Sequence, residues 1–139
     1  MLDKLKEKYP DKDIQLICGN YLEYDFGKNC FDTAISFQTM HHFTHAEKVA
    51  LYTKVYHALN SKGVYIECDY MVTDQAEEVR FFAEYAKLRQ KLNLSEGELY
   101  HYDTPCTIDN QIALLKQAGF SNVEMVWRMG NTTIIIAKK

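Results

Sequence analysis

The stretch Phe31–Phe43, which reads FDTAISFQTMHHF, limits the possible folds of this chain more than any other part of it. Its short apolar run, Thr33–Phe37, is typical of a β-strand that is buried on both faces. The polar residues Gln38 and Thr39 follow at once and end the strand. We therefore expect a central strand whose carboxyl end is followed by polar and histidine side chains.

A helix and a second strand follow this stretch. Thr44 and Glu47 have the spacing of a capping box, in which each side chain satisfies a free backbone N–H at a helix start. We expect the helix to continue to about Leu59, with its lysines, Lys48 among them, in solvent. The next apolar run, Val64–Cys68, is then a parallel strand reached through a crossover helix. This order predicts an α/β fold.

In open α/β sheets, ligands bind in the crevice outside the carboxyl ends of the strands. The residues that the sequence puts at this position are Ser36, Phe37, Gln38, His41, His42, Asp69 and Tyr70. We expect a binding site there.

The remaining elements have local signals of their own. Leu2–Tyr9 is predicted to be a short amphipathic helix that ends before Pro10, and Ile14–Cys18 a strand. Two further helices are expected after Asp74 and Thr107, with Gly119 as the C-terminal cap of the second. The chain then closes with two strands, Val123–Arg128 and Thr132–Ala137, joined by a tight turn at Gly130 and Asn131.

Asn93–Cys106 is the longest irregular segment and contains Tyr100, His101 and Asp103. A loop of this length is often a lid over a binding site, and its aromatic and ionisable residues suit a cover over a small substrate. A plain surface loop explains the same sequence equally well.

Composition narrows the function. The 139 residues carry a formal net charge of −3 with interspersed signs, so a nucleic-acid partner is not expected and a small-molecule substrate is favoured. A single domain over residues 1–139 is expected. The cysteines Cys18, Cys30, Cys68 and Cys106 stand far apart, which predicts reduced, mostly buried thiols in a cytoplasmic protein. No segment has the length of a membrane span or a signal peptide.

Several motifs occur in the order known from one large family. They are Gly19-Asn20-Tyr21, Phe31-Asp32-x-Ala34-x-Ser36, Met40-His41-His42, Leu59-Asn60-Ser61-Lys62-Gly63 and Ala118-Gly119-Phe120. The chain resembles the small-molecule branch of the class I S-adenosylmethionine-dependent methyltransferases from about Ile14 to its end. The resemblance implies a Rossmann-like sheet, mostly parallel with a C-terminal antiparallel hairpin. The glycine-rich cofactor-binding block with which the family begins does not precede Ile14, so the domain is expected to be N-terminally truncated.

The resemblance implies transfer of a methyl group from S-adenosylmethionine to a small-molecule acceptor. It assigns adenine contacts to Asn20 and Tyr21, and contacts with the methionyl side of the cofactor to Phe37 and Gln38. Asn20 stands where the family usually has an acid, and its amide oxygen can accept the same hydrogen bond without the assistance of a charge. A simple turn at Gly19 and Asn20 is the competing interpretation.

His42 and His41 are the best-placed candidates for catalysis, because a neutral imidazole can take a proton from an oxygen or nitrogen nucleophile. Tyr100 and His101 are further candidates if the loop is a lid. A polar residue packed where a helix begins is the competing role for His42. No metal site is expected from His41, His42 and His45, because the capping box interrupts their helical spacing and no cysteine or carboxylate stands nearby.

A non-catalytic domain is the alternative function. In the family's strand order, the missing block flanks the strand that ends at Phe37, so that strand becomes an exposed edge here. An exposed edge tends to pair with another chain. We expect either a homodimer joined at this edge, or insertion of the Ile14–Cys18 strand into the vacant position.

Overall fold

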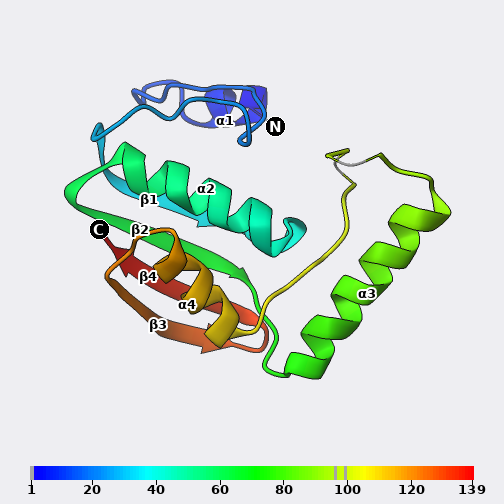
Figure 1. The fold of residues 1–139 in the computed structure, drawn as a ribbon. Helices are drawn as coiled ribbons and strands as arrows, with labels where there is room; N and C mark the ends of the chain where they lie inside the picture. Colours follow the sequence, from blue (N-terminus) through cyan, green and yellow to red (C-terminus); the bar gives the residue numbers. More distant parts are fainter. Residues whose placement is uncertain (1, 96, 99) are drawn as a thin grey trace.

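A computed structural model describes residues 2–95, 97–98 and 100–139. Its sheet contains four strands in the order β1-β2-β4-β3 (Figure 1). The strands are β1 (Phe31–Phe37), β2 (Leu59–Tyr70), β3 (Asn122–Met129) and β4 (Thr132–Lys138). β1 and β2 are parallel, whereas β4 is antiparallel to both of its neighbours. The predicted α/β sheet with a C-terminal antiparallel hairpin is confirmed, but among the described strands only one of the three pairings is parallel, so the expectation of a mostly parallel sheet does not hold for them.

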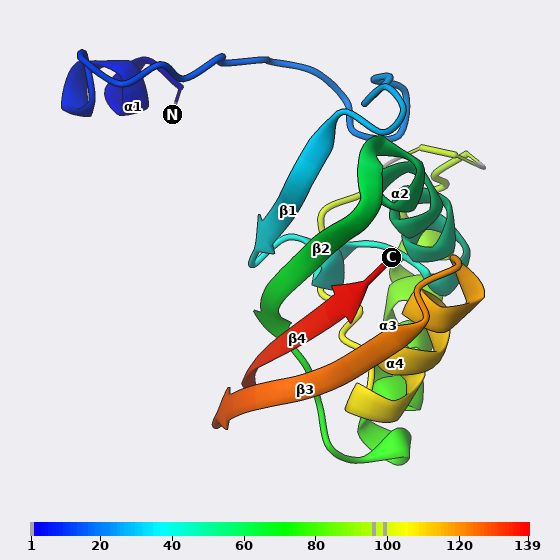
Figure 2. The same ribbon diagram turned by 90° about the vertical axis from the view of Figure 1, so that its left-hand side faces the viewer.

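The helices α2 (His45–Ala58) and α4 (Ile108–Gln117) cover one face of this sheet, as Figure 2 shows. α2 begins with the predicted capping box, because Glu47 N–H donates to the Thr44 hydroxyl and Thr44 N–H donates to the Glu47 carboxylate. α3 (Gln75–Lys91) begins at Asp74, whose carboxylate accepts from Ala76 N–H at 2.8 Å. These helix starts are local features and agree with the sequence pattern.

The core lies between the sheet and these two helices. Leu51 and Tyr52 of α2, Leu115 of α4, Tyr65 of β2 and Ile135 of β4 are at most 1% exposed. The alternating side chains of β2 and β4 that face the helices are buried, and those on the opposite face are half-buried. The helix-covered face therefore contains the hydrophobic core.

The opposite face of the sheet is open in the described part of the chain. Ile35 and Phe37 of β1 are 70% and 69% exposed, so the prediction that this strand is buried on both faces is wrong. β1 pairs with β2 on one side, and no other described strand pairs with its second side. The apolar run of β1 is suited to burial, but no described element covers its outer face or its free edge.

The N-terminal segment lies apart from the sheet (Figure 2). α1 (Leu2–Lys8) forms as predicted but buries none of its side chains. The strand predicted over Ile14–Cys18 is wrong, because these residues are extended but unpaired and Ile14 and Ile17 are each 45% exposed. They do not occupy the position beside β1. A strand requires a neighbour for its backbone hydrogen bonds, and this segment has none among the described residues.

Other predictions need correction. β2 begins at Leu59 rather than Val64, because an irregularity in its register with β1 takes up the residues that were expected to form a turn.

The prediction that Lys48 is solvated is wrong, since its side chain is 1% exposed. Cys18 and Cys30 are exposed, Cys68 is half-buried and only Cys106 is buried, so the expected burial of most thiols is also wrong. None of the described helices has the length and apolarity that crossing a bilayer requires.

Candidate functional site

The carboxyl ends of the parallel strands β1 and β2 lie side by side, as the sheet topology predicts. Gln38 ends β1 in a left-handed conformation with φ of +50°, and its N–H donates to Cys68 O of β2 at 2.8 Å. The chain then forms the short 3₁₀ helix η1 (Met40–His42). This turn brings His41 to the side chain of Asp69 near the end of β2.

Asp69 holds this turn in place. Its carboxylate accepts hydrogen bonds from Met40 N–H at 2.6 Å, Tyr70 N–H at 2.7 Å and Thr39 N–H at 3.2 Å, and it pairs with His41 Nδ1. Burial opposes the charge of Asp69, but the bond and charge of His41 and the backbone donors outweigh it, so its pKa lies below the ordinary value. Asp69 is therefore an anionic anchor for the imidazole of His41.

Asp103 joins the histidines from a distant part of the chain. Thr104 N–H donates to His41 O at 2.6 Å, and the Thr104 hydroxyl donates to His41 O at 3.1 Å and to Phe43 O at 3.0 Å. As a result, Asp103 Oδ1 lies 3.3 Å from His42 Nδ1 and 3.7 Å from His41 Nε2. We call His41, His42, His101 and Asp103 the histidine cluster.

The imidazoles of the cluster are close to one another. The ring centroids of His41 and His42 are 3.9 Å apart, and those of His42 and His101 are 4.0 Å apart. Burial, followed by the neighbouring His41 and His101, lowers the pKa of His42 below 6.5, although Asp103 acts in the opposite direction. The predicted catalytic residues His41, His42 and His101 are thus brought together.

Tyr100, the fourth predicted catalytic residue, is half-buried and does not line the cavity beside β1 that is described below. The predicted lid that contains it includes Glu96 and Leu99, which lie outside the described residues. Part of this segment is tied to α3, because Arg89 donates to Ser95 O at 2.5 Å and to Glu98 O at 2.6 Å. A lid role for this loop stays a prediction.

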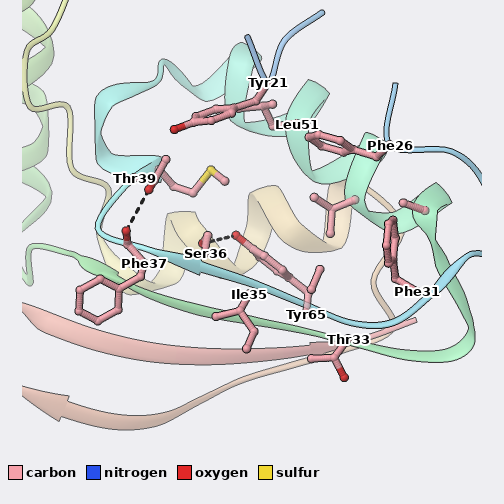
Figure 3. A pocket seen from close by; sticks show the side chains of 14 residues that line it. Tyr21, Phe26, Phe31, Thr33, Ile35, Ser36, Phe37, Thr39, Leu51 and Tyr65 are labelled. Atoms are coloured by element: carbon pink, nitrogen blue, oxygen red, sulfur yellow. Dashed lines mark hydrogen bonds between the residues drawn. The ribbon is translucent and has the colours of Figure 1, made fainter. Parts of the chain in front are cut away.

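A cavity of about 460 Å³ runs along the free edge of β1, beneath α2. We call it the β1 cavity. Figure 3 shows Tyr21, Phe26 and Leu51 above β1, while Ile35 and Thr33 point from the opposite side of the strand. Its volume lies within the range of small-molecule sites. The lining reaches Thr39 and Met40, directly before His41.

The predicted cofactor residues fall into two groups. Tyr21 and Phe37 line the β1 cavity, whereas Asn20 and Gln38 are not among its lining residues. The side-chain oxygen of Asn20 accepts from Leu22 N–H at 3.1 Å, which agrees with the competing interpretation of this residue as part of a turn. The cavity therefore unites one residue of each predicted contact set.

The sequence pattern did not identify Asp69 or Asp103 as partners of the histidines. The position of Asp69 at a strand end is a usable signal, because carboxyl ends of neighbouring parallel strands meet at one edge. Asp103 has no such signal. Its position depends on the contacts of Thr104 with backbone oxygens more than 60 residues earlier.

Comparisons with known proteins identify similar sequences and similar folds. A family profile described as a methyltransferase domain matches residues 1–63. The carboxy-S-adenosyl-L-methionine synthase of Helicobacter hepaticus is 28% identical over 149 aligned residues, which cover 100% of this chain and 62% of that protein. This chain therefore spans less than two thirds of the length of that curated relative.

Two solved structures show the extent of the shared fold. The structure described as PigF with SAH has a TM-score of 0.73 at 16% identity, covering 99% of this chain and 39% of PigF. Human N-acetylserotonin methyltransferase in complex with SAM has a TM-score of 0.61 at 16% identity, covering 87% of this chain and 32% of the human protein. In sequence this chain resembles a methyltransferase domain over residues 1–63, and it shares the fold of S-adenosylmethionine-dependent methyltransferases, which agrees with the resemblance that the motifs indicated.

Proposed function

We propose that this chain serves in the transfer of a methyl group from S-adenosylmethionine to a small-molecule acceptor. The observation that carries the proposal is that the residues which line one end of the β1 cavity directly precede the histidine cluster in the chain. Thr39 and Met40 end the cavity at the carboxyl end of β1, and His41 follows them directly. Related folds are known with SAM or SAH bound.

The lining of the β1 cavity fits part of this cofactor. Its fourteen residues are aromatic, aliphatic or hydroxyl-bearing, apart from the thioether Met40, and none of them carries a formal charge. Tyr21 offers aromatic surface to an adenine ring, whereas the ring of Phe37 lies on the other side of β1, as Ile35 does (Figure 3). The amino and carboxylate groups of the cofactor find no opposite charge in this lining. We expect weak binding unless another segment or chain supplies such groups.

When bound, the cofactor supplies a methyl group that its sulfonium already activates. The residues of this chain would bind the cofactor and the acceptor, orient them toward each other and exclude water. These contributions suffice for an in-line displacement. We assign the acceptor to the region of the histidine cluster, where ring nitrogens and Asp103 can orient a polar group. His42, His41, Tyr100 and His101 remain our proposed residues for this step.

Synthesis of carboxy-S-adenosyl-L-methionine is a second candidate. It is favoured by the relative from Helicobacter hepaticus, whose alignment includes the whole of this chain. This reaction would leave the added group on the cofactor rather than on an acceptor. Mass spectrometry of the reaction mixture separates the two, because a carboxylated cofactor and a methylated acceptor are different products.

We also propose that the free edge of β1 pairs with a second copy of this chain. The edge is unpaired among the described residues, and Ile35 and Phe37 expose apolar surface beside it. Antiparallel pairing of two such edges is self-complementary and closes a twofold dimer. A domain that acts only through such an interface is the non-catalytic alternative.

The four free thiols are compatible with a cytoplasmic location.

Calorimetric titration of S-adenosylhomocysteine into the purified chain tests the proposal. Saturable heat whose affinity Tyr21→Ala weakens supports a cofactor site in the β1 cavity. Absence of saturable heat at millimolar ligand contradicts cofactor binding by this chain and leaves the non-catalytic alternative. The titration uses chelator-treated protein, so that metal binding does not contribute to the heat.

A further inference from the structure

We propose that His41, His42 and Asp103 form a binding site for a divalent transition-metal cation of the zinc class. Each of these residues offers one ligand atom, and the three atoms lie within 4.8 Å of one another. Imidazole nitrogen and carboxylate oxygen are ligands that Zn²⁺ and its neighbours accept. The inference concerns binding and does not depend on methyl transfer.

The distances already approach those of a coordination shell. Ligands about 2.1 Å from a tetrahedral metal ion lie roughly 3.4 Å from one another. Asp103 Oδ1 lies 3.3 Å from His42 Nδ1 and 3.7 Å from His41 Nε2. Only small side-chain movements would be needed to place a cation among these atoms.

The surroundings of His41 fit a metal ligand. Its Nδ1 pairs with Asp69, which leaves Nε2 on the side of Asp103. A carboxylate that receives the second ring N–H of a ligating histidine fixes the tautomer and increases the basicity of the ligand. Asp69 is itself fixed by the backbone N–H groups of Thr39, Met40 and Tyr70. The orientation of His41 as a ligand through Nε2 is therefore fixed by Asp69 without a bound cation.

His42 adds an independent observation. Its Nδ1 is buried and has no hydrogen-bond partner in the described structure, although Asp103 Oδ1 lies 3.3 Å away. A buried nitrogen without a partner is costly, and a cation between the two groups would satisfy both. The hydrogen bonds of Thr104 hold the Asp103 segment against the histidines.

A second group of possible ligands does not compete. His45, Glu78 and Cys106 also offer atoms within 4.8 Å of one another. However, Glu78 already accepts from Thr107 N–H, from Asn110 and from His45, and Cys106 Sγ lies 2.9 Å from the Lys48 ammonium group. The positive charge of Lys48 opposes a cation there.

Three protein ligands leave a coordination position for water or for an oxygen atom of a substrate. If the proposed methyl transfer holds, an oxygen-containing acceptor could occupy this position beside the β1 cavity. This extension rests on the proposed function, whereas the cation site does not.

Titration of the tag-free, chelator-treated chain with Co²⁺ and Zn²⁺ tests the site. We expect one ion per chain, Co²⁺ absorption typical of a low-coordinate nitrogen and oxygen site, and displacement by Zn²⁺. His42→Ala and Asp103→Asn should each weaken binding about tenfold or more, and Asp69→Asn about tenfold through His41. The matched controls His57→Ala and His45→Ala should bind as the unchanged chain does.

Asp103 is 46% exposed, so Asp103→Asn should keep the fold, which circular dichroism checks for every variant. Binding weaker than millimolar, or binding that Asp103→Asn leaves intact and His45→Ala abolishes, would overturn the assignment. Cation binding without any S-adenosylhomocysteine binding would uphold this site and refute the proposed function, so the two failures are distinct.

Discussion

The hydroxyl of Tyr65 donates to Glu67 Oε2 at 2.8 Å inside the core, and both side chains are at most 1% exposed. Tyr52 and Gln111 complete the surroundings of this carboxyl group, which Gln111 Nε2 contacts from α4. Burial, with the nearby Asp69, raises the pKa of Glu67 from 4.5 to about 7. A carboxyl group in the core therefore titrates near neutral pH.

Glu67→Gln should change how stability depends on pH. Because the folded chain keeps a proton that the unfolded chain releases, the stabilising contribution is complete below 4.5 and is lost as the pH rises through about 7. The difference between the pKa of 4.5 in the unfolded chain and about 7 in the folded chain corresponds to about 3 kcal/mol of unfolding free energy. The free energy of unfolding of Glu67→Gln, measured with urea, should lack this fall.

Glu124→Gln is the control for this experiment, since Glu124 is exposed on β3. It should reproduce the pH dependence of the unchanged chain. Parallel curves for the Glu67→Gln and Glu124→Gln variants between about pH 4.5 and about pH 8 would show that Glu67 does not titrate there.

Lys48→Ala should destabilise the fold. The Lys48 ammonium group donates to Thr104 O at 3.2 Å and to Cys106 Sγ at 2.9 Å, and its hydrocarbon stem is buried. Truncation removes both contacts and leaves a cavity, for a loss of about 2–3 kcal/mol in urea unfolding. Lys62 is exposed, so Lys62→Ala should change the free energy of unfolding by less than about 0.5 kcal/mol. Equal effects of the two variants would contradict the described packing of Lys48.

Tyr21→Ala should weaken the binding of S-adenosylhomocysteine about tenfold, as expected for the loss of one aromatic contact. Tyr21 lines the β1 cavity, whereas the nearby Tyr24 packs against Phe26 and is not a lining residue. Tyr24→Ala is therefore the matched control in calorimetry. A larger effect of Tyr24→Ala than of Tyr21→Ala would place the ligand elsewhere.

Ile35→Lys should abolish the dimer that we propose. A charge on the outer face of an edge strand opposes pairing with another chain. Light scattering coupled to size exclusion should report a dimer for the unchanged chain and a monomer for Ile35→Lys. Val79→Lys, on the 58% exposed Val79 of α3, should remain dimeric. A monomeric unchanged chain would rule out this interface.

The elements predicted correctly have signals that act over a few residues. The capping box of Thr44 and Glu47 marks the start of α2 in sequence and structure alike. Gly130, with φ of +59°, and Asn131 likewise join β3 to β4 as expected. Such contacts are independent of distant parts of the chain, which is why the pattern suffices.

The incorrect predictions concern features that depend on distant partners. Ile14–Cys18 has the composition of a strand but no neighbour with which to pair. Lys48 has a charged side chain of the kind that helices usually expose, and its burial follows from Thr104 and Cys106, more than 50 residues away. The position of His41 and His42 could be predicted because the carboxyl ends of parallel strands meet at one edge of the sheet. The contact of Asp103 with these histidines could not be predicted from the sequence.

The hydrogen bonds of Thr104 with His41 O and Phe43 O join residues more than 60 positions apart. During synthesis, His41 and His42 leave the ribosome well before Asp103, because they stand about 60 residues earlier in the chain. Contacts across so long a loop form late, because closure costs entropy before any bond repays it. A growing chain would therefore contain both histidines and helix α2 before Asp103 and Thr104 are available to complete the histidine cluster.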